Sequence, residues 1–395
     1  MDYIVNYYEI EVLSPTTVTS GNKIPGFQVA VQGRKAYIID IMKMIKENQR
    51  VLRLVETFDF NSNQSFLDRL KTERIDYKSY VKYELDYFGS TNRIIQINEI
   101  MKTAGRPYIP GSSIKGAVRS MLSKALNKEQ VYVKSLEDAI KTKEEFKRKK
   151  PNREFDASTI CDDKAEEELF GSPNYSPFRF LNISDTDVVS VSNLELCDVK
   201  VLNICGEKAM WFAGKEKNIE DKQWAISIHT EALKSGTKLN GKISSGFVQY
   251  FKENKSTGIK NIDIVIDYVS KIKREVQSYI ASEIEFYKKY NKNDELTDVL
   301  EFYENLNDMN MKLKDNEFIL QVGFSTGYKP KSVIKNINKE FIQKLKVVSK
   351  GKVYDYMFPK TRRLLYKNGR IEAPLGWIKI TLLPWGRLYE LYEWC

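Results

Sequence analysis

An amphipathic stretch between Ile264 and Tyr290 constrains the fold of this chain more than any other segment does. Its apolar residues stand at positions 265, 269, 272, 276, 280, 284 and 287, which places them on one face of a long helix. A second helical run, Leu296 to Leu313, follows after a short polar turn. The two runs predict an αα-hairpin that covers a sheet, because the apolar face of each helix has to be buried against another layer.

Strand-like segments and isolated helices alternate along the rest of the chain. Tyr3 to Leu13 is expected to form an opening strand that ends at Ser14-Pro15. From Ile114 to Leu126 the apolar residues recur at three-to-four spacing, which predicts the clearest helix of the first half. Two further helices are expected over Ile39 to Leu54 and Ser65 to Lys71.

Two β-rich runs, Phe178 to Val201 and Trp224 to Phe251, contain residues typical of turns. Ser235-Gly236 and Asn240-Gly241 are expected to be hairpin turns, and the strands beside them are expected to join one sheet.

The C-terminal part returns to strands after the helical hairpin. Strands are expected over Phe318 to Phe324 and Trp377 to Leu383, with a hairpin turn at Asn368-Gly369 between them. Strands that alternate with isolated helices predict an α+β fold. The favoured unit is a ferredoxin-like (RRM-like) βαββαβ core with large insertions, a helical hairpin and a C-terminal β-rich region.

Three regions are expected along the chain. Residues 1–255 would form an N-terminal ferredoxin-like region with insertions at about 40–105 and 130–165. Residues 256–316 would form the helical hairpin, and residues 317–395 the C-terminal β-rich region.

The balance of charge favours a polyanionic partner without deciding the matter. The chain has 63 Lys and Arg residues against 53 Asp and Glu residues, a formal net charge of +10 and a pI of about 9.0. Such an excess is typical of proteins that bind nucleic acid. Because 29% of the residues are charged and lie along the whole chain, an ordinary solvated surface accounts for the same excess.

The four cysteines predict no metal centre and no disulfide framework. They form no CxxC pair and accompany a single histidine, so we expect no metal and no cofactor. No apolar run approaches the roughly 18 residues that span a bilayer, and Met1 to Asn6 does not begin a signal peptide. These observations predict a soluble, cytoplasmic protein without membrane contact.

A glycine-bracketed segment, Pro110 to Gly116, precedes the helix of the first half. Gly111 comes before two possible serine N-caps, Ser112 and Ser113, which predicts free backbone N–H groups at a helix N-terminus, where a phosphate can bind. Lys115 and Arg119 lie one turn apart on the non-apolar face and would bind the same anion. A capped surface helix without a ligand explains the pattern equally well. A Walker A loop is excluded because Ala117-Val118 stand where Lys and Ser or Thr are required.

A second glycine-bracketed segment, Gly323 to Lys331, contains an aromatic residue and two lysines, and a basic stretch at Pro359 to Arg363 follows it. A basic groove with a tyrosine can follow a sugar-phosphate backbone and stack a base. A basic surface hairpin is the alternative. The RNA-binding residues predicted from the two glycine segments and the basic stretch are Gly111, Ser112, Ser113, Lys115, Gly116, Arg119, Gly323, Gly327, Tyr328, Lys329, Lys331, Lys360, Arg362 and Arg363.

Several of these segments belong to a series of short sequence motifs that follow one another in a fixed order. In chain order they are Leu13-Ser14-Pro15 through Ser20-Gly21, Tyr108 to Arg119, Glu168 to Ser172, Arg179 to Asp185, and Glu231 to Gly241. In residues and in order, the series resembles the signatures of the RAMP superfamily of CRISPR proteins. The C-terminal segments Gly323 to Lys331 and Pro359 to Arg363, with Pro374-Leu375-Gly376-Trp377, resemble one branch, the fifth subunit of the type III-A Csm effector complex. The resemblance covers about residues 3–383 and leaves the insertions unmatched.

The resemblance implies a non-catalytic RNA-binding subunit of a CRISPR interference complex. Such a subunit sits at the 3′ end of the guide RNA, caps the filament of repeated backbone subunits and supports guide maturation. Its glycine loop and basic tail would hold phosphates rather than read sequence. The partners that the resemblance implies are guide (CRISPR) RNA, target RNA, the other Csm subunits, chiefly the backbone subunit, and host nucleases that trim the guide.

Two alternatives stay open at this point. Related RAMP proteins include metal-independent endoribonucleases that process guide RNA, commonly with histidine as general acid or base. The only histidine here is His229, in a β-like segment where a buried structural histidine is the favoured interpretation. The acids Asp162-Asp163 and Glu166-Glu167-Glu168 are read as solvated rather than as a Mg²⁺ site. The other alternative is an assembly subunit without direct RNA contact.

Overall fold

The computed structural model describes residues 5–59, 66–91, 94–151, 153, 158–215, 217–244, 259–335, 337–348 and 358–383. Helices and strands alternate along these residues, which confirms the predicted α+β class. The helices are α1 (Ile41–Glu47), α2 (Gln49–Thr57), α3 (Phe66–Thr72), α4 (Gly111–Ala125), α5 (Glu129–Lys149), α6 (Ser158–Phe170), α8 (Tyr268–Tyr290), α9 (Thr297–Lys312) and α10 (Lys339–Val348).

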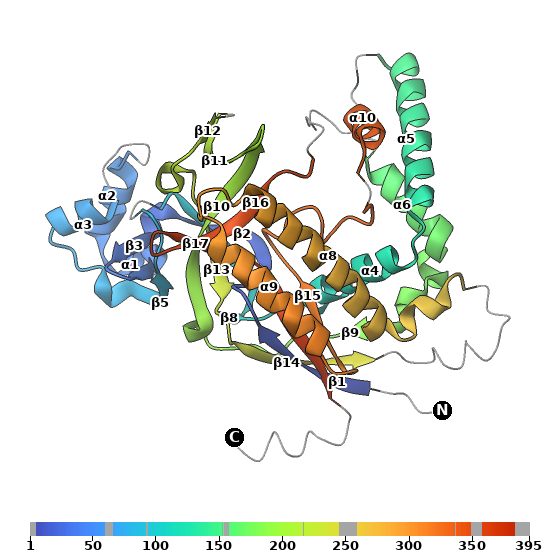
Figure 1. Cartoon of the computed structure of the whole chain (residues 1–395). Coiled ribbons are helices and arrows are strands. Elements are labelled where there is room, and N and C mark those ends of the chain that lie inside the picture. Colours follow the sequence, from blue (N-terminus) through green and yellow to red (C-terminus); the bar gives the residue numbers. More distant parts are fainter. Residues whose placement is uncertain are drawn as a thin grey trace.

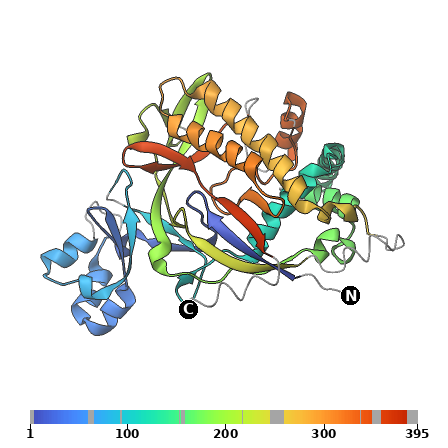
Figure 2. The ribbon, with the colours of Figure 1, turned by 60° about the horizontal axis from the view of Figure 1, so that its bottom comes forward.

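A five-stranded sheet joins the two ends of the sequence. Every neighbouring pair in it is antiparallel. In spatial order its strands are β15 (Glu317–Gln321), β18 (Trp377–Leu383), β1 (Val5–Val12), β14 (Lys238–Ser244) and β9 (Asn182–Ile183). Figure 2 shows β1, β14 and β18, which come from distant parts of the chain, side by side.

The prediction of a turn at Asn240-Gly241 is wrong. Both residues lie inside β14, where Gly241 pairs with Tyr8 of β1. A Cβ at Gly241 would come within 2.3 Å of the Tyr8 ring, so the glycine is needed for close packing rather than for chain reversal.

A second sheet has eleven strands. Its main path runs β2 (Thr19–Pro25), β6 (Gln96–Ile100), β13 (Ile228–Leu233), β10 (Leu194–Cys205), β5 (Val81–Tyr87), β4 (Lys35–Ile39) and β3 (Val29–Gln32). The remaining strands are β11 (Lys208–Gly214), β12 (Lys217–Ile219), β16 (Arg362–Lys367) and β17 (Arg370–Pro374). A separate two-stranded ladder consists of β7 (Lys102–Thr103) and β8 (Arg106–Pro107).

The β-rich runs therefore do not join one sheet, as the sequence had suggested. At Ser235-Gly236 the chain turns a corner between the sheets, because Leu233 pairs with Thr16 and the Thr237 carbonyl accepts a hydrogen bond from Val12 N–H. The predicted Asn368-Gly369 turn is confirmed: it connects β16 to β17, and both residues have positive φ, 50° and 85°.

The predicted αα-hairpin is confirmed by α8 and α9, which pack against each other across the sheets (Figure 1). Trp377 of β18 lies beneath them, with its ring centroid 5.7 Å from that of Tyr279 in a stacked arrangement. Tyr287 of α8 and Tyr303 of α9 stack at 5.5 Å. This aromatic contact supplies the apolar layer that the helix pattern required.

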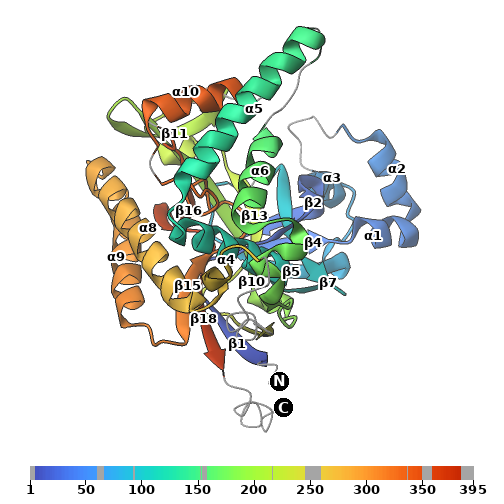
Figure 3. The ribbon, with the colours of Figure 1, turned by 90° about the vertical axis from the view of Figure 1, so that its right-hand side faces the viewer.

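Two smaller helical groups flank the sheets. Helices α1 to α3 lie at the left of Figure 1 around Met44 and Leu70. Helix α3 agrees with the helix predicted over 65–71, but the single helix predicted over 39–54 is wrong: Ile39 ends β4, and Asn48 separates α1 from α2. On the opposite side, α5 and α6 account for most of the predicted 130–165 insertion. Figure 3 shows α10 against α5, where Leu136 and Phe341 share a small apolar cluster.

The division into three regions stays a prediction. The boundary at residues 255–256 lies outside the described residues. Strands of the first and third regions, β1 and β18, pair directly in one sheet.

Candidate nucleic-acid interface

Helix α4 begins at Gly111, so the prediction that Ser112 or Ser113 caps it is wrong: both serines lie inside its first turn. Pro110 is the N-cap residue, and its carbonyl accepts from the N–H groups of Ser113 and Ile114. The Gly111 N–H donates to Asp185 Oδ1 at 2.8 Å. Among the described residues, only the Ser112 N–H at this helix start has no hydrogen-bond partner. The helix start therefore has fewer free N–H groups than the sequence predicted.

One face of α4 nevertheless stays open. Ser112, Lys115, Gly116 and Arg119 are three or four residues apart and share this face. Gly116 is exposed, and a Cβ built on it would meet nothing within 4 Å. Packing therefore does not explain this glycine. An exposed glycine inside a helix lowers stability by about 1 kcal/mol relative to alanine, so its presence needs another reason.

An open cavity of about 500 Å³ lies at the N-terminal end of this face. Ser112 and Lys115 line it from α4, and Lys242 lines it from β14. Lys242 was not predicted as a site residue, because it lies in a strand far from either glycine segment. Strand pairing alone brings it to α4.

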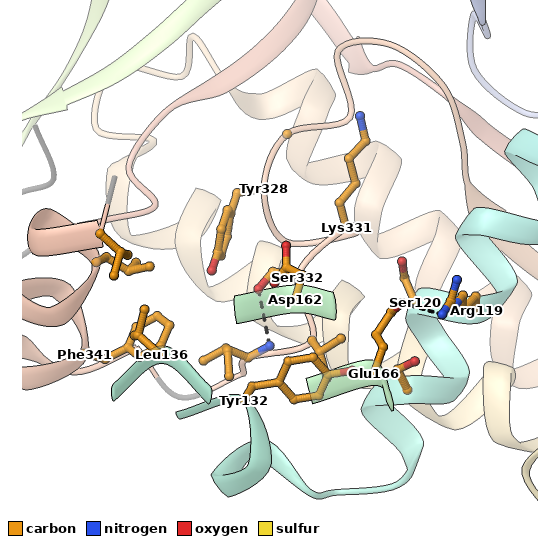
Figure 4. A pocket seen from close by; sticks show the side chains of 16 residues that line it. Arg119, Ser120, Tyr132, Leu136, Asp162, Glu166, Tyr328, Lys331, Ser332 and Phe341 are labelled. Carbon is orange, nitrogen blue, oxygen red and sulfur yellow. Dashed lines mark hydrogen bonds and ion pairs between the residues drawn. The ribbon is translucent and has the colours of Figure 1, made fainter. Parts of the chain in front are cut away.

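A second cavity, of about 480 Å³, joins the C-terminal end of the face to the second glycine segment. Arg119 lines it together with Gly327, Tyr328 and Lys331, which lie more than 200 residues further along the chain. Figure 4 shows Arg119 beside Glu166 of α6, with Tyr328 and Lys331 on the loop opposite. Arg119 forms an ion pair with Glu166, and its guanidinium lies 5.4 Å from the Phe178 ring centroid.

Acidic groups line the same cavity. Burial raises the pKa of Glu166, although the charge of Arg119 opposes this shift, and burial also raises the pKa of Asp162. An anion that enters here therefore has to compete with Glu166 for Arg119.

The positive side chains form a continuous series, which we call the cationic strip: Lys242, Lys115, Arg119, Lys331 and Arg363. Lys242 and Lys115 share one cavity, and Arg119 and Lys331 share the other. Burial, and then the charge of Arg119, lower the pKa of Lys115. Burial, and then the charge of Arg363, lower the pKa of Lys331. Arg119 is the one member with a carboxylate partner in the described part of the chain.

Two other predicted RNA-binding residues are engaged inside the protein. Glu283 of α8 is fully buried, and the Arg362 guanidinium donates to its two oxygens at 2.6 and 2.8 Å. The Lys329 ammonium lies 2.8 Å from Glu283 Oε1. These contacts tie the 323–331 loop and the start of β16 to α8. Glu283 was missed in the sequence, although an acid on the apolar face between Ile280 and Tyr287 is a signal that could have found it.

The remaining predicted residues divide between packing and exposure. A Cβ at Gly323 would come within 2.0 Å of the Thr17 carbonyl oxygen, so this glycine seats the loop against the strand end. Gly327 is exposed with nothing near its Cβ position. Lys360 is half-buried just before β16. The Arg363 guanidinium lies 5.4 Å from the Phe324 ring centroid.

His229 lies on β13, outside the cationic strip, and is 5% exposed. Its Nε2 lies 3.1 Å from the Tyr87 hydroxyl, and burial lowers its pKa. Within the described ranges, no group of three or more His, Cys, Asp and Glu side chains is arranged to hold a metal ion. Among the helices of those ranges, none combines the length and the apolar character that a membrane crossing requires.

Known proteins similar to this chain are CRISPR proteins. The chain is 24% identical over 94% of its length to the CRISPR system Cms protein Csm5 of Methanocaldococcus jannaschii, of which it covers 88%. It is 27% identical over 31% of its length to the protein of the same name from Streptococcus thermophilus, of which it covers 38%.

Solved structures share the fold. The crystal structure of T. onnurineus Csm5 has a TM-score of 0.59 at 18% identity, over 94% of this chain and 99% of that one. A chain in a cryo-EM structure of a Csm–crRNA–target RNA ternary complex, from a type III-A CRISPR-Cas system, has a TM-score of 0.62 at 18% identity, over 95% and 100% of the two chains. The model of the RAMP superfamily matches residues 9–367, nearly the whole chain. The chain belongs to the RAMP superfamily.

Proposed function

We propose that this chain binds the sugar-phosphate backbone of guide RNA along the cationic strip, as a non-catalytic subunit of a type III-A CRISPR Csm complex. The strip is the observation that carries the proposal. Neighbouring like charges repel each other, and an anion that lies along them removes this repulsion and releases counterions on binding. The name of the relatives, Csm5, and the assembly that contains one structural neighbour support the same assignment.

Gly116 supports the placement of the RNA. A glycine at an exposed helix position lowers stability, and glycine is used where a ligand has to approach the backbone closely. Gly116 lies on the face that carries Ser112, Lys115 and Arg119, between the two cavities. A phosphate over Gly116 would be within reach of both cationic side chains, so the ligand accounts for the glycine.

Within the complex, we place the subunit at the 3′ end of the guide RNA in the cytoplasm. There it caps the filament of repeated backbone subunits and supports guide maturation, together with the nucleases that trim the guide. Contacts to phosphate position an RNA without reading its sequence. Arg362 and Lys329 act indirectly in this arrangement, because their ion pairs with Glu283 hold the loop that carries Lys331.

The five-stranded sheet, with α4 and α8, provides the ferredoxin-like core in this proposal. The order β1–α4–β9–β14–α8–β18 is a βαββαβ sequence, and β1 lies between β18 and β14. The two helices pack on each other, as the helices of such a core do. The eleven-stranded sheet then contains the insertions.

Neutralising three members of the strip tests the function. Lys115, Lys331 and Arg363 are each replaced by Gln, and binding of a single-stranded RNA is measured by fluorescence anisotropy between 50 and 200 mM salt. We expect weaker binding and a salt dependence of log K that is shallower by about 2, since each lost phosphate contact to single-stranded RNA removes roughly 0.7. The thermal midpoint should change little, because these side chains make no ion pair within the described ranges.

A matched control removes the same charge elsewhere. Lys43, Lys46 and Arg53 on α1 and α2 are exposed and lie on the other side of the molecule from α4 (Figure 1). Their replacement by Gln should leave the RNA affinity close to that of the wild type. Equal losses in the two triple variants would show that the net charge matters and the strip does not.

A cleavage assay tests the non-catalytic assignment. Purified protein is incubated with labelled guide precursor, with and without EDTA. We expect intact RNA in both samples. Cleavage that disappears in the His229→Ala variant or in the presence of the chelator would establish a nuclease instead.

A further inference from the structure

A third cavity, of about 610 Å³, lies on the eleven-stranded sheet and contains no residue of the cationic strip. The segments that line it precede and open β6, or connect β12 to β13 and open β13. None of the described lining residues carries a charge; they are neutral polar or apolar. Such a cavity does not suit a phosphate or another ion, which needs a charged partner in a partly buried site.

Apolar side chains form an exposed rim around this cavity. Trp224 is 74% exposed, Ile95 is 81% exposed and Ile226 is 41% exposed. Tryptophan is usually buried, at least in large part, and contiguous exposed apolar patches are typical of interaction sites, so this rim is a candidate contact surface.

The backbone around Trp224 is fixed. Its N–H donates to the Asp221 carbonyl at 3.3 Å, and the Ala225 N–H donates to the Lys222 carbonyl at 3.2 Å. An ion pair of 2.9 Å holds Lys222 to Glu295. The indole is therefore presented on a short, braced turn, which lowers the entropy lost when a ligand stacks on it.

The wall of the cavity offers unused hydrogen-bonding atoms. The Tyr87 hydroxyl donates to the Thr91 carbonyl at 2.7 Å, so it accepts from His229, and the proton of the neutral imidazole is on Nε2. No described residue binds Nδ1, which leaves an acceptor on a side chain that is 5% exposed and lines the cavity. Asn98 donates its Nδ2 to the His229 carbonyl at 3.0 Å and retains its Oδ1 as a second acceptor.

A buried polar network fixes this wall from behind. The Lys200 ammonium is fully buried and donates to the Ser90 hydroxyl at 2.9 Å and the Ser227 hydroxyl at 2.8 Å. The Ser90 hydroxyl donates in turn to Asp198 Oδ2 at 2.7 Å. Ser90 and Ser227 line the cavity, so their hydroxyls are held in place and already paired.

We propose that this cavity binds one unpaired nucleobase, with the ring stacked on the Trp224 indole and its polar edge donating to His229 Nδ1 and Asn98 Oδ1. A planar heterocycle with ring N–H or amino groups matches an exposed aromatic face beside neutral acceptors. An apolar protein segment would use the rim and leave both acceptors in the wall unpaired, which makes it the poorer match. This inference rests on the proposed function, because it supplies the RNA with a base contact in addition to the phosphate contacts of the strip.

The test separates stacking from charge. Trp224→Ala and Trp224→Phe are compared with the wild type for binding to a single-stranded RNA and to an abasic RNA of the same length. Met311→Ala, which removes another mostly exposed apolar side chain, from α9, is the control. Loss of one stacked base lowers affinity roughly 5-fold to roughly 150-fold. We expect that loss in Trp224→Ala, a smaller loss in Trp224→Phe, and none in Met311→Ala.

Two results distinguish this site from the strip. The Trp224→Ala loss should vanish with abasic RNA, and the salt dependence of binding should be unchanged, because no phosphate contact is removed. Unchanged affinity of Trp224→Ala for normal RNA, with a loss in the Lys115, Lys331 and Arg363 variant, overturns this inference and leaves the proposed function intact. If Trp224→Ala instead loses only its association with other subunits of the complex, the rim is a protein contact and the inference is wrong. A wild-type chain that binds neither RNA overturns both proposals.

Discussion

Replacing Gly116 by alanine should make the protein more stable and a poorer RNA binder. The position lies inside α4, and a Cβ there has nothing within 4 Å, so the new methyl group causes no clash. An exposed helical glycine lowers stability by about 0.5–1 kcal/mol relative to alanine. We therefore expect the free energy of unfolding to rise by about that amount in urea titrations followed by circular dichroism.

The same methyl group stands in the middle of the open face of α4. It would hold a phosphate away from Lys115 or Arg119 and weaken one charge-assisted hydrogen bond. Such a bond contributes about 1.5–3 kcal/mol, so the RNA affinity should fall by about tenfold or more. Anisotropy titrations with labelled single-stranded RNA at fixed salt measure this loss.

Gly111 provides the matched comparison within the same helix. A Cβ there would come within 2.3 Å of the Ile183 carbonyl oxygen, which is backbone and cannot move aside easily. Gly111→Ala should therefore lower both the stability, by about 1–3 kcal/mol, and the RNA affinity. A Gly116→Ala variant that gains stability and keeps its full RNA affinity would refute the claim that a ligand approaches this face.

Three further substitutions probe the contacts that hold the site. Glu283→Gln should lower the free energy of unfolding by about 3 kcal/mol at pH 7, because the two partly buried cations, Lys329 and Arg362, lose their buried counter-ion. Burial acts to raise the pKa of Glu283, but the neighbouring cations outweigh it and hold the pKa below its ordinary 4.5. The carboxylate thus stabilises the fold above pH 4.5, and this contribution disappears as the pH falls through the folded-state pKa. In urea titrations, the difference in the free energy of unfolding between the wild type and the variant should therefore be smaller at pH 3.5 than at pH 7. Gly323→Ala should lower the thermal midpoint far more than Gly327→Ala does. Both glycines have positive φ, but a Cβ would clash with backbone only at Gly323. Equal midpoints of the two variants would contradict this. Lys102→Met should destabilise the protein by about 3 kcal/mol in urea, since it removes the ammonium 2.7 Å from the fully buried Glu231, and a change below about 1 kcal/mol would disprove that role.

Local patterns in the sequence predicted the elements whose structure depends on near neighbours. The apolar stripe from Ile264 to Tyr290 was enough to predict helix α8, because apolar residues at helical spacing indicate which face of a helix is buried. The pair Asn368-Gly369 was enough to predict the turn between β16 and β17, because few residue pairs adopt two positive φ angles. Asn240-Gly241 is the same pair of residues but lies inside β14, because the ring of Tyr8, from the N-terminal strand β1, fills the space that a side chain would occupy.

The sequence by itself determined the helical hairpin, the α+β class and, through resemblance, the RAMP superfamily. Which strands pair, and which cations stay available, depends on groups that are distant along the chain. Tertiary contacts alone bring Lys242 beside Lys115 and Lys331 beside Arg119, and they direct Lys329 and Arg362 onto Glu283. A basic residue looks the same in a sequence whether its charge faces solvent or a buried carboxylate, and only the packed structure distinguishes the two.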